Sequence, residues 1–401
     1  MTVDLAAIQS ARKRIAEHVA VTPLAPSRTL SALTKRELVL KFENLQFTAS
    51  FKERGALNRL CLLSEDERKR GVVAMSAGNH AQALAYHGGR LDVPVTIVMP
   101  KNTPNAKVRQ TSVFGAEVLL RGDTFAATLA VTQELAAKRG ATLIHPFDDE
   151  AVIAGQGTLG LELLEQAPDL HTIVVPVGGG GLIAGVAVAV RSIRPDIRIV
   201  GVQTERFAAV HDALQGNESR TTRPGTVAEG IAVETPGSIT LPIIREHVDR
   251  VVTVTEPEIE DAVFALLEVE KTVTEGAGAC PLAAVKAYPD IGAGGVTALV
   301  LTGGNIDMMI LSSILQRGLV RTRRLVRIKV EAPDVPGAMA DLTRILGDLD
   351  SNIVDIAHQR AFAAATVRTT AIEFVLQMRG KEQVEAVLDS LRGAGYDAAE
   401  S

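Results

Sequence analysis

Short apolar runs and helical segments alternate from residue 38 to about residue 301, an order that only a narrow group of folds accommodates. Runs such as 72–75 and 95–99 are apolar almost throughout, whereas a half-exposed strand would carry a polar residue at every second position. Continuous apolar strands are typical of parallel sheets that helices cover on both faces. We therefore predict an α/β fold built on doubly wound parallel sheets.

The same periodicity predicts the individual elements. Thr255, with Glu258 three residues later, predicts a capping box at the start of a helix, and Asp4 predicts the cap of an N-terminal helix. The predicted strands are 38–42, 72–75, 95–99, 117–120, 142–144, 172–177, 198–202, 251–254 and 297–301. The predicted helices between them include 79–87, 104–114, 125–138 and 256–270.

The pattern changes near Arg317, where a group of arginines predicts a solvated connector rather than a nucleic-acid contact: Arg317, Arg321, Arg323, Arg324 and Arg327. A βαββαβ order follows, which is the ferredoxin-like arrangement; its predicted elements are 325–330, 337–349, 352–356, 371–378, 382–391 and a short strand near Tyr396. We predict a main domain over residues 1–320 with a small subdomain at about 70–150, a linker over 321–325 and a separate domain over 326–401.

Composition excludes several classes of protein. The chain has no tryptophan, 3% aromatic residues and a formal net charge of −5, which argues against a nucleic-acid partner. Cys61 and Cys280 belong to no Cys/His cluster, so we expect neither a zinc site nor a disulfide scaffold. The N-terminus has no continuous apolar block, and the uncharged stretch 173–190 contains Pro176 and a glycine cluster. We expect a cytoplasmic protein with no membrane partner.

Two motifs indicate chemistry. Lys52 follows the small and apolar segment 48–51, where a desolvated amine can lose its proton and form a Schiff base; the alternative is an ordinary surface charge. An unbroken glycine run stands between a predicted strand and a predicted helix, where free N–H groups can hold a phosphate. An aldehyde and a phosphate in one cofactor indicate pyridoxal 5'-phosphate. The glycine run comprises Gly178, Gly179, Gly180 and Gly181.

The glycine run has a second interpretation. Gly179, Gly181 and Ala184 match the dinucleotide pattern G-x-G-x-x-A, and Glu205 follows at roughly the distance expected of a ribose-binding acid. An NAD-dependent dehydrogenase is therefore a remote alternative, although it explains neither Lys52 nor the other strand ends.

Two other predicted strands end in polar residues. The segment Ser76-Ala77-Gly78-Asn79-His80 follows the strand 72–75 and opens a helix, which is suited to a substrate carboxylate or, alternatively, to a simple cap by Ser76. Thr302 follows the strand 297–301, where its hydroxyl can hydrogen-bond a pyridine nitrogen or cap a glycine turn.

Taken together, these motifs resemble the threonine dehydratases (threonine ammonia-lyases), two-subdomain enzymes of the fold-type II pyridoxal-phosphate family with a C-terminal ACT domain. The resemblance covers residues 5 to about 320, and the tail resembles an ACT domain. It rests on Ser50-Phe51-Lys52, Arg54-Gly55-Ala56, Ser76–Gln82, Gly178–Leu182, Gly303-Gly304-Asn305, Asp334-Val335-Pro336-Gly337, Asn352-Ile353-Val354-Asp355 and His358-Gln359-Arg360.

The resemblance implies a role for each matching residue. Lys52 would hold the cofactor and, once freed, remove the Cα proton of L-threonine. The cofactor phosphate would protonate the leaving hydroxyl, giving 2-oxobutanoate and ammonia, and L-serine would give pyruvate. Phe51, Asn79 and Thr302 would contact the ring, with Asn79 on its hydroxyl and Thr302 at its nitrogen. The phosphate would lie on Gly178, Gly179, Gly180, Gly181 and Leu182, and the substrate carboxylate on Ser76, Ala77, Gly78, Asn79 and His80.

Some positions depart from the family pattern. Ala49 replaces a usual glycine, with an expected effect on substrate size, and Thr302 and Glu229 replace a frequent serine and aspartate. Serine racemases, an alternative, carry a serine as second base at Ala77. Those racemases and the hydroxyaspartate dehydratases also have acidic metal ligands near Gln203 and Ala209, so we expect no metal requirement here.

In the ACT region the resemblance implies an effector site and an oligomer. The turn at Pro336 and Gly337, with Asp334 and Asn352, would receive an amino-acid effector. Isoleucine inhibition would suit a role in isoleucine biosynthesis. The alternatives are a dimerisation module without a ligand, or a sensor without catalysis. ACT domains generally pair, which implies a homodimer or homotetramer.

Overall fold

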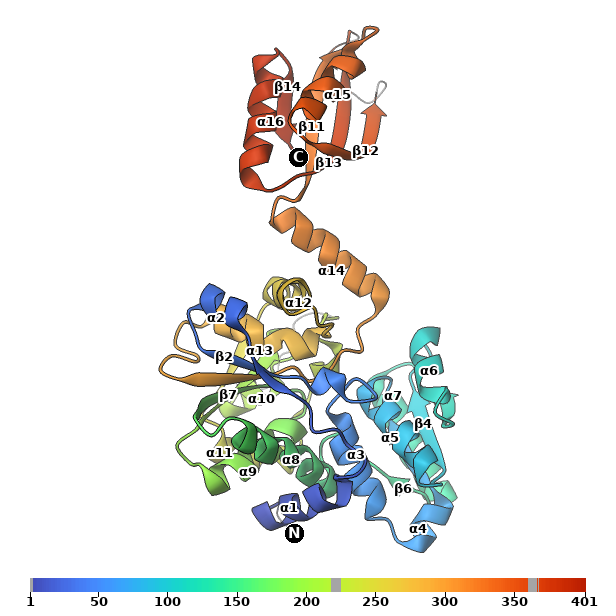
Figure 1. Cartoon of the computed structure of the whole chain (residues 1–401). Coiled ribbons are helices and arrows are strands. Elements are labelled where there is room, and N and C mark those ends of the chain that lie inside the picture. The colour runs from blue at the N-terminus through green and yellow to red at the C-terminus, as the bar shows by residue number, and fades with distance from the viewer. Residues whose placement is uncertain (1–2, 218–224, 360–365, 367) are drawn as a thin grey trace. The chain divides into compact units, whose positions relative to one another are not determined.

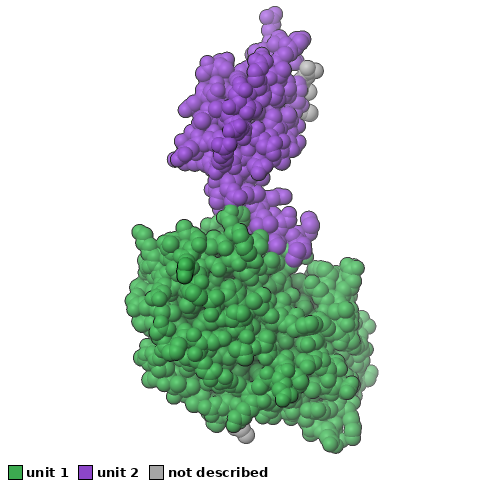
Figure 2. Space-filling model, viewed as in Figure 1, with its two compact units in different colours: residues 1–307 green, residues 308–401 purple. Residues whose placement is uncertain are grey.

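A computed structural model describes residues 3–217, 225–359, 366 and 368–401. The chain forms two compact units, Met1–Asp307 and Met308–Ser401, which Figure 2 colours separately. Arg360 of the motif His358-Gln359-Arg360 lies outside the described residues. Within the described part, no helix combines the length and apolar character needed to cross a membrane.

The first unit contains two largely parallel sheets, as the continuous apolar runs predict. The larger sheet has the order β1-β2-β10-β7-β8-β9, and only the β1–β2 pair is antiparallel. The smaller sheet, β5-β4-β3-β6, is parallel throughout. The strands are β1 Leu24–Pro26, β2 Leu38–Lys41, β3 Val72–Met75, β4 Val95–Met99, β5 Glu117–Leu120, β6 Thr142–Leu143, β7 Leu170–Pro176, β8 Arg198–Thr204, β9 Arg250–Val254 and β10 Val296–Val300.

Helices cover both faces of the larger sheet (Figure 1). Helices α1, α8, α9 and α11 pack together on one face, and α12 and α13 pack together on the other. The helices are α1 Leu5–Ile15, α2 Arg28–Thr34, α3 Lys52–Cys61, α4 Glu65–Arg70, α5 Asn79–Arg90, α6 Asn105–Ser112, α7 Phe125–Arg139, α8 Glu150–Gln166, α9 Gly181–Ile193, α10 Ala209–Leu214, α11 Thr240–His247, α12 Glu256–Glu270 and α13 Gly276–Ala287, with 3-10 turns η1 Glu43–Leu45 and η2 Glu229–Ile231.

The predicted caps are confirmed. The Asp4 side chain accepts a hydrogen bond from the Ala7 amide at the start of α1. Thr255 and Glu258 form the full capping box of α12, which satisfies two backbone donors that the helix itself leaves unpaired. The uncharged stretch 173–190 becomes most of β7, a glycine turn and most of α9, in agreement with its interpretation as buried strand and helix.

Glycines allow the central helices to approach one another closely. A Cβ on Gly155 of α8 would lie 2.6 Å from the Cα of Gly55 on α3, and a Cβ on Gly157 would lie 2.8 Å from the Gly185 carbonyl on α9. Glycine lowers helix propensity, so these residues obscure the helical pattern of α8 in the sequence. The contact holds α3, which begins at Lys52, against the core.

The second unit has the predicted βαββαβ order and an antiparallel sheet, β12-β13-β11-β14. Its core includes Ile328, Phe374 and Val387, which are fully buried between the sheet and its two helices. The elements are α14 Met308–Arg321, β11 Leu325–Pro333, α15 Ala338–Asp348, β12 Asn352–Gln359, β13 Thr369–Gln377, α16 Lys381–Gly393 and β14 Asp397–Glu400.

The connector lies within the predicted linker 321–325, but it contains only two of the five arginines that indicated it. Arg317 and Arg321 lie in α14, and Arg327 lies in β11, so only residues 322–324 connect the two elements. The helix persists because Ile314 and Gly318, one turn apart, are both buried. Helix α14 packs against β11 and therefore belongs with the second unit, although the sequence placed residues up to 320 in the first.

Candidate active site

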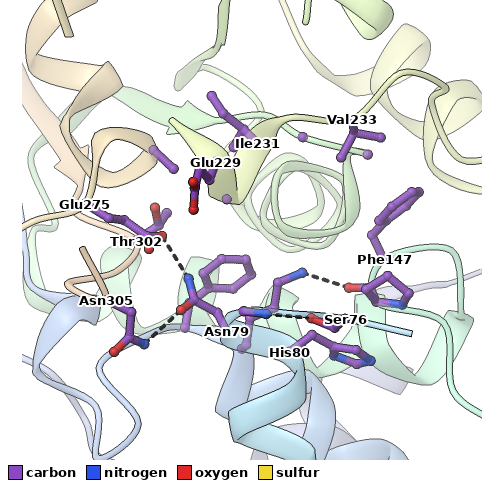
Figure 3. Close-up of a pocket in the computed structure, with 18 of the residues that line it drawn as sticks. Ser76, Asn79, His80, Phe147, Glu229, Ile231, Val233, Glu275, Thr302 and Asn305 are labelled. Carbon is purple, nitrogen blue, oxygen red and sulfur yellow. Dashed lines mark hydrogen bonds between the residues drawn. The ribbon is translucent and has the colours of Figure 1, made fainter. Parts of the chain in front are cut away.

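Strands β3, β7 and β10 all end at one pocket of about 290 Å³ in the first unit, shown in Figure 3. Ligand sites in open parallel sheets form at such carboxyl ends, because the following loops meet there. The structure brings together in this pocket every residue that the sequence nominated for the cofactor and the substrate: Phe51, Lys52, Ser76, Ala77, Gly78, Asn79, His80, Gly178, Gly179, Gly180, Gly181, Leu182 and Thr302.

Lys52 is the first residue of α3 and points its amine into the pocket. Its Nζ donates a 2.8 Å hydrogen bond to the Pro146 carbonyl and lies 5.1 Å from the centre of the Phe51 ring. Burial lowers the pKa of Lys52 to about 8, although the Glu275 carboxylate opposes this shift. A substantial fraction of the amine is therefore neutral and nucleophilic near physiological pH.

The glycine run forms the turn into α9. Gly180 has a φ of +97°, which a residue with a side chain adopts only with strain. A Cβ on Gly179 would lie 2.2 Å from the Phe147 ring, so only glycine allows this close packing. The first N–H groups of α9 consequently face the pocket at the positive end of a helix, an arrangement that binds phosphate.

Three polar side chains form a chain of hydrogen bonds on the pocket wall (Figure 3). Asn79 Nδ2 donates to Glu275 Oε1 over 2.8 Å, and Asn305 Nδ2 donates to Asn79 Oδ1 over 2.8 Å. Asn305 also donates to the Thr48 carbonyl, four residues before Lys52. The sequence pattern predicts no role for Glu275, which is separated from Asn79 by 196 positions. Its only local signal is a carboxylate directly before the glycine that opens α13.

The segment between β3 and α5 presents small residues to the pocket. The Gly78 amide donates to the Ser76 hydroxyl, which holds this turn closed. Burial lowers the pKa of His80 to about 3, so its imidazole is neutral and cannot offer a positive charge to a carboxylate. The positive end of α5, with its free N–H groups, is the part of this segment that is suited to an anion.

An ion pair beside the pocket joins two segments that are far apart in the sequence. Lys107 of α6 and Glu229 of η2 both line the pocket, and their side chains meet at 2.5 Å. Sequence reasoning noted Glu229 only as a departure from the family pattern. Its partner is separated by 122 positions, and no local pattern signals the contact.

Ala49 departs from the expectation that its methyl group narrows the pocket. Among the described residues that line the pocket, Ala49 does not appear. Its backbone has a φ of +53°, in the left-handed region that favours glycine. Gly304 N donates to the Ala49 carbonyl over 2.9 Å, which holds the strained conformation in place.

Replacing Ala49 with glycine is therefore expected to raise the free energy of unfolding by roughly 0.5–1 kcal/mol, because relief of left-handed strain exceeds the added entropy of the unfolded chain. Urea unfolding of the two proteins measures this. The matched control is Ala137→Gly in α7, an exposed helical position that should lose roughly 0.5–1 kcal/mol. A loss of stability in Ala49→Gly would contradict the strain.

Gln203 and Ala209 stand where the racemases and hydroxyaspartate dehydratases are expected to carry acidic metal ligands, and neither residue is acidic. Gln203 is fully buried; its Nε2 donates to the Val177 carbonyl, and its Oε1 accepts from the His211 amide. Ala209 opens α10 and is buried as well. Among the described residues, no group of three or more His, Cys, Asp or Glu side chains is arranged to hold a metal ion.

The predicted effector residues do not form one group within a single chain. Asp334, Pro336 and Gly337 lie in the turn between β11 and α15, where the preceding strand pairs with the Thr369 end of β13. Asn352 pairs with Gln377 at the other end of β13. At 3.3 Å per residue the two ends are separated by about 25 Å.

Comparisons with known proteins agree with this geometry. The family model for pyridoxal-phosphate dependent enzymes matches residues 15–303, and the chain belongs to that family. The chain is 43% identical to the L-threonine ammonia-lyase of Thermotoga maritima over 396 residues, 98% of either protein.

Two solved structures are also similar to this chain. The T.th. threonine deaminase has a TM-score of 0.72 and 41% identity, covering 76% of this chain and 99% of that one. The serine racemase of Dictyostelium discoideum has a TM-score of 0.72 and 38% identity, covering 77% of this chain and 100% of that one.

The pocket residues fit the cofactor of this family. The Lys52 amine suits its aldehyde, and the N-terminus of α9 suits its phosphate. Thr302, which is 3% exposed, lies at the end of β10 and offers a neutral hydroxyl rather than a carboxylate. A neutral partner suits an unprotonated pyridine nitrogen.

Proposed function

We propose that this protein is a pyridoxal-phosphate dependent ammonia-lyase that converts L-threonine to 2-oxobutanoate and ammonia, and L-serine to pyruvate. The observation that carries the proposal is the position of Lys52, whose readily deprotonated amine shares one pocket with the N-terminus of α9 and with Asn79. Support also comes from L-threonine ammonia-lyases that are 43% and 44% identical over 98% and 97% of their own length.

Each pocket residue has a task in this reaction. The cofactor supplies an electron sink that makes the Cα proton of the bound amino acid acidic. The Lys52 amine takes that proton, and its hydrogen bond to the Pro146 carbonyl sets the direction in which Nζ points. The turn 76–80 and the positive end of α5 hold the substrate carboxylate. The β-hydroxyl would leave with a proton as water, and the enamine that remains would hydrolyse to the oxo acid and ammonia after release.

Racemisation of serine is the second candidate, because a serine racemase is among the similar structures. Racemisation needs a proton donor on the face of the substrate opposite the lysine. At Ala77, where racemases carry that group, this chain has a methyl group that lines the pocket. The amide of Gln203 is also engaged by backbone groups and is not an acidic metal ligand.

One experiment separates these activities. Purified protein is incubated with L-threonine, L-serine or hydroxyaspartate, with and without EDTA, and 2-oxo acids and D-serine are quantified. We expect oxo acids from threonine and serine, unaffected by EDTA, and D-serine only at background. D-serine formation, or an activity that EDTA removes, would favour the racemase or the hydroxyaspartate dehydratase.

We further propose that the second unit is an ACT-type regulatory domain of a cytoplasmic homo-oligomer. Support comes from its βαββαβ order and from Gly337, whose φ of +95° forms a turn at the start of α15. The separation of Asn352 from this turn means that a site using both needs residues of two chains. Isoleucine is the proposed effector, and titrating it into the threonine assay tests this role; unchanged activity at saturating isoleucine would exclude it.

A further inference from the structure

Glu275 is a carboxylate in the pocket wall that the reaction described above does not use. It precedes α13, and its side chain lines the pocket and points toward Asn79 (Figure 3). Burial raises the pKa of Glu275 to about 7, although the hydrogen bond from Asn79 lowers it. A carboxylate is costly to bury, and its presence in this pocket indicates a specific task.

Two glycines make room for this carboxylate. A Cβ on Gly303 would lie 2.7 Å from Glu275 Oε1, and a Cβ on Gly230 would lie 2.9 Å from the same atom. The Glu275 amide also donates to the Gly303 carbonyl over 2.9 Å. Backbone from two other segments, at Gly230 and Gly303, therefore flanks Oε1 and restricts its position.

The hydrogen bonds of Asn79 have a definite direction. Asn305 Nδ2 can only donate, so the atom that it contacts on Asn79 is the oxygen. The nitrogen of Asn79 consequently faces Glu275, which as a carboxylate can only accept. Asn305 is oriented in turn by the Thr48 carbonyl, 2.8 Å away. These contacts leave Asn79 Nδ2 one further hydrogen for an acceptor in the pocket.

We propose that Glu275 is a positioning residue that holds the Asn79 amide with its nitrogen toward the cofactor ring, so that Asn79 donates to the ring oxygen. The inference rests on the proposed function and on the assignment of Asn79 to that oxygen. Loss of the Glu275 side chain removes the acceptor that keeps the amide nitrogen on this side. Asn79 then rotates more freely, and the cofactor is held less firmly.

Protonation of Glu275 should have a similar effect, because a carboxylic acid is a weaker acceptor and can donate to the Asn79 oxygen instead. The charged groups that face Glu275 are Lys52, Lys107 and Glu229; the lysines favour its ionised form, and Glu229 opposes it. The ionised fraction falls as pH falls through about 7, so cofactor binding and kcat should decline on the acid side.

The test compares Glu275→Gln with Glu275→Ala. Glutamine keeps an acceptor oxygen for Asn79 but does not titrate, whereas alanine keeps neither property. Cofactor affinity is measured from the visible absorbance during titration of the apoprotein with pyridoxal 5'-phosphate between pH 5.5 and 9. The values of kcat and KM for threonine and the thermal midpoint of the apoprotein are recorded alongside. Glu246→Gln, on the exposed end of α11, is the matched control.

We expect Glu275→Ala to lose about 10- to 100-fold in cofactor affinity and kcat, with little change in KM. Glu275→Gln should fall between the natural protein and Glu275→Ala at pH 8, because its amide is a weaker acceptor than a carboxylate, and it should lack the decline that titration of Glu275 causes below pH 7. Unchanged affinity and kcat in Glu275→Ala, with only a lower thermal midpoint, would reduce Glu275 to a structural role. Equal losses of cofactor affinity and kcat in both variants would show that the charge of Glu275 is its essential property. That result would contradict the proposal that Glu275 positions the Asn79 amide.

The affinity measurement also separates this inference from the proposed function. If the natural protein bound the cofactor but did not deaminate threonine, the substrate assignment would fail. The effect of the two Glu275 variants on cofactor affinity would still decide the role of Glu275.

Discussion

Replacing Lys52 with alanine is expected to abolish the visible absorbance of the bound cofactor and to lower 2-oxo acid release from L-threonine by at least about 10³-fold. Both losses have one cause, because the same amine binds the cofactor and takes the Cα proton. Its hydrogen bond to Pro146 and its lowered pKa prepare it for both tasks. Absorbance spectra and a coupled assay for the oxo acid measure the two effects.

The matched control is Lys101→Ala, because Lys101 is an exposed lysine of the same unit that pairs with the exposed Asp123. This variant should keep the spectrum and the activity of the natural protein, since exposed ion pairs contribute about 0.2–1 kcal/mol at most. A Lys52→Ala protein that folds and still turns over threonine would remove Lys52 from the mechanism.

The second large expected effect is a loss of stability, and it concerns the buried ionic cluster around Arg54. Arg54 is 1% exposed and contacts two carboxylates, Glu43 at 2.8 Å and Glu162 at 2.6 Å. Lys41 also contacts Glu162, at 2.7 Å, so two cations and two anions balance. Burial would raise the pKa of Glu43, but Arg54, together with Thr22 and Lys41, outweighs burial and holds that pKa below its ordinary value.

Arg54→Met is expected to cost about 3–5 kcal/mol of unfolding free energy, because it leaves an uncompensated negative charge in the core. Arg54→Met combined with Glu162→Gln restores neutrality and should recover part of that loss. The control is Arg12→Met, which removes a partly exposed pair with Glu165 and should cost at most about 1 kcal/mol. Urea unfolding measures all three; similar losses for Arg54→Met and Arg12→Met would contradict the importance of the buried cluster.

Much of the fold follows from local pattern. Strands β3, β4 and β5 match their predicted bounds, because short apolar runs that are followed by proline or by polar residues have little choice of conformation. Helix α8 was not among the predicted helices, because its glycines lower the helix propensity of the segment. These glycines allow close contacts with α3 and α9. The arginines of α14 suggested a connector because the buried Ile314 and Gly318 give a weak apolar pattern.

In the candidate site, too, residues that belong to a local motif were predicted and residues defined by distant contacts were not. Lys52 and the glycine run were found because each carries its chemistry within a few consecutive residues. Glu275 was not predicted, because its contact with Asn79 forms only where three segments that are distant in the sequence meet in the fold. The strain at Ala49 was likewise invisible, since a φ angle is a property of the folded backbone. Sequence motifs therefore indicate the reacting groups better than they indicate the groups that position them.

The central claim is that this pocket deaminates L-threonine, and product analysis tests it most directly. Purified protein with pyridoxal 5'-phosphate and EDTA is given L-threonine, and 2-oxobutanoate and ammonia are quantified over time. We predict continuous release of both products in equal amounts, and none from the Lys52→Ala protein. Absence of 2-oxobutanoate from a protein that shows the absorbance of bound cofactor would contradict the assignment to threonine.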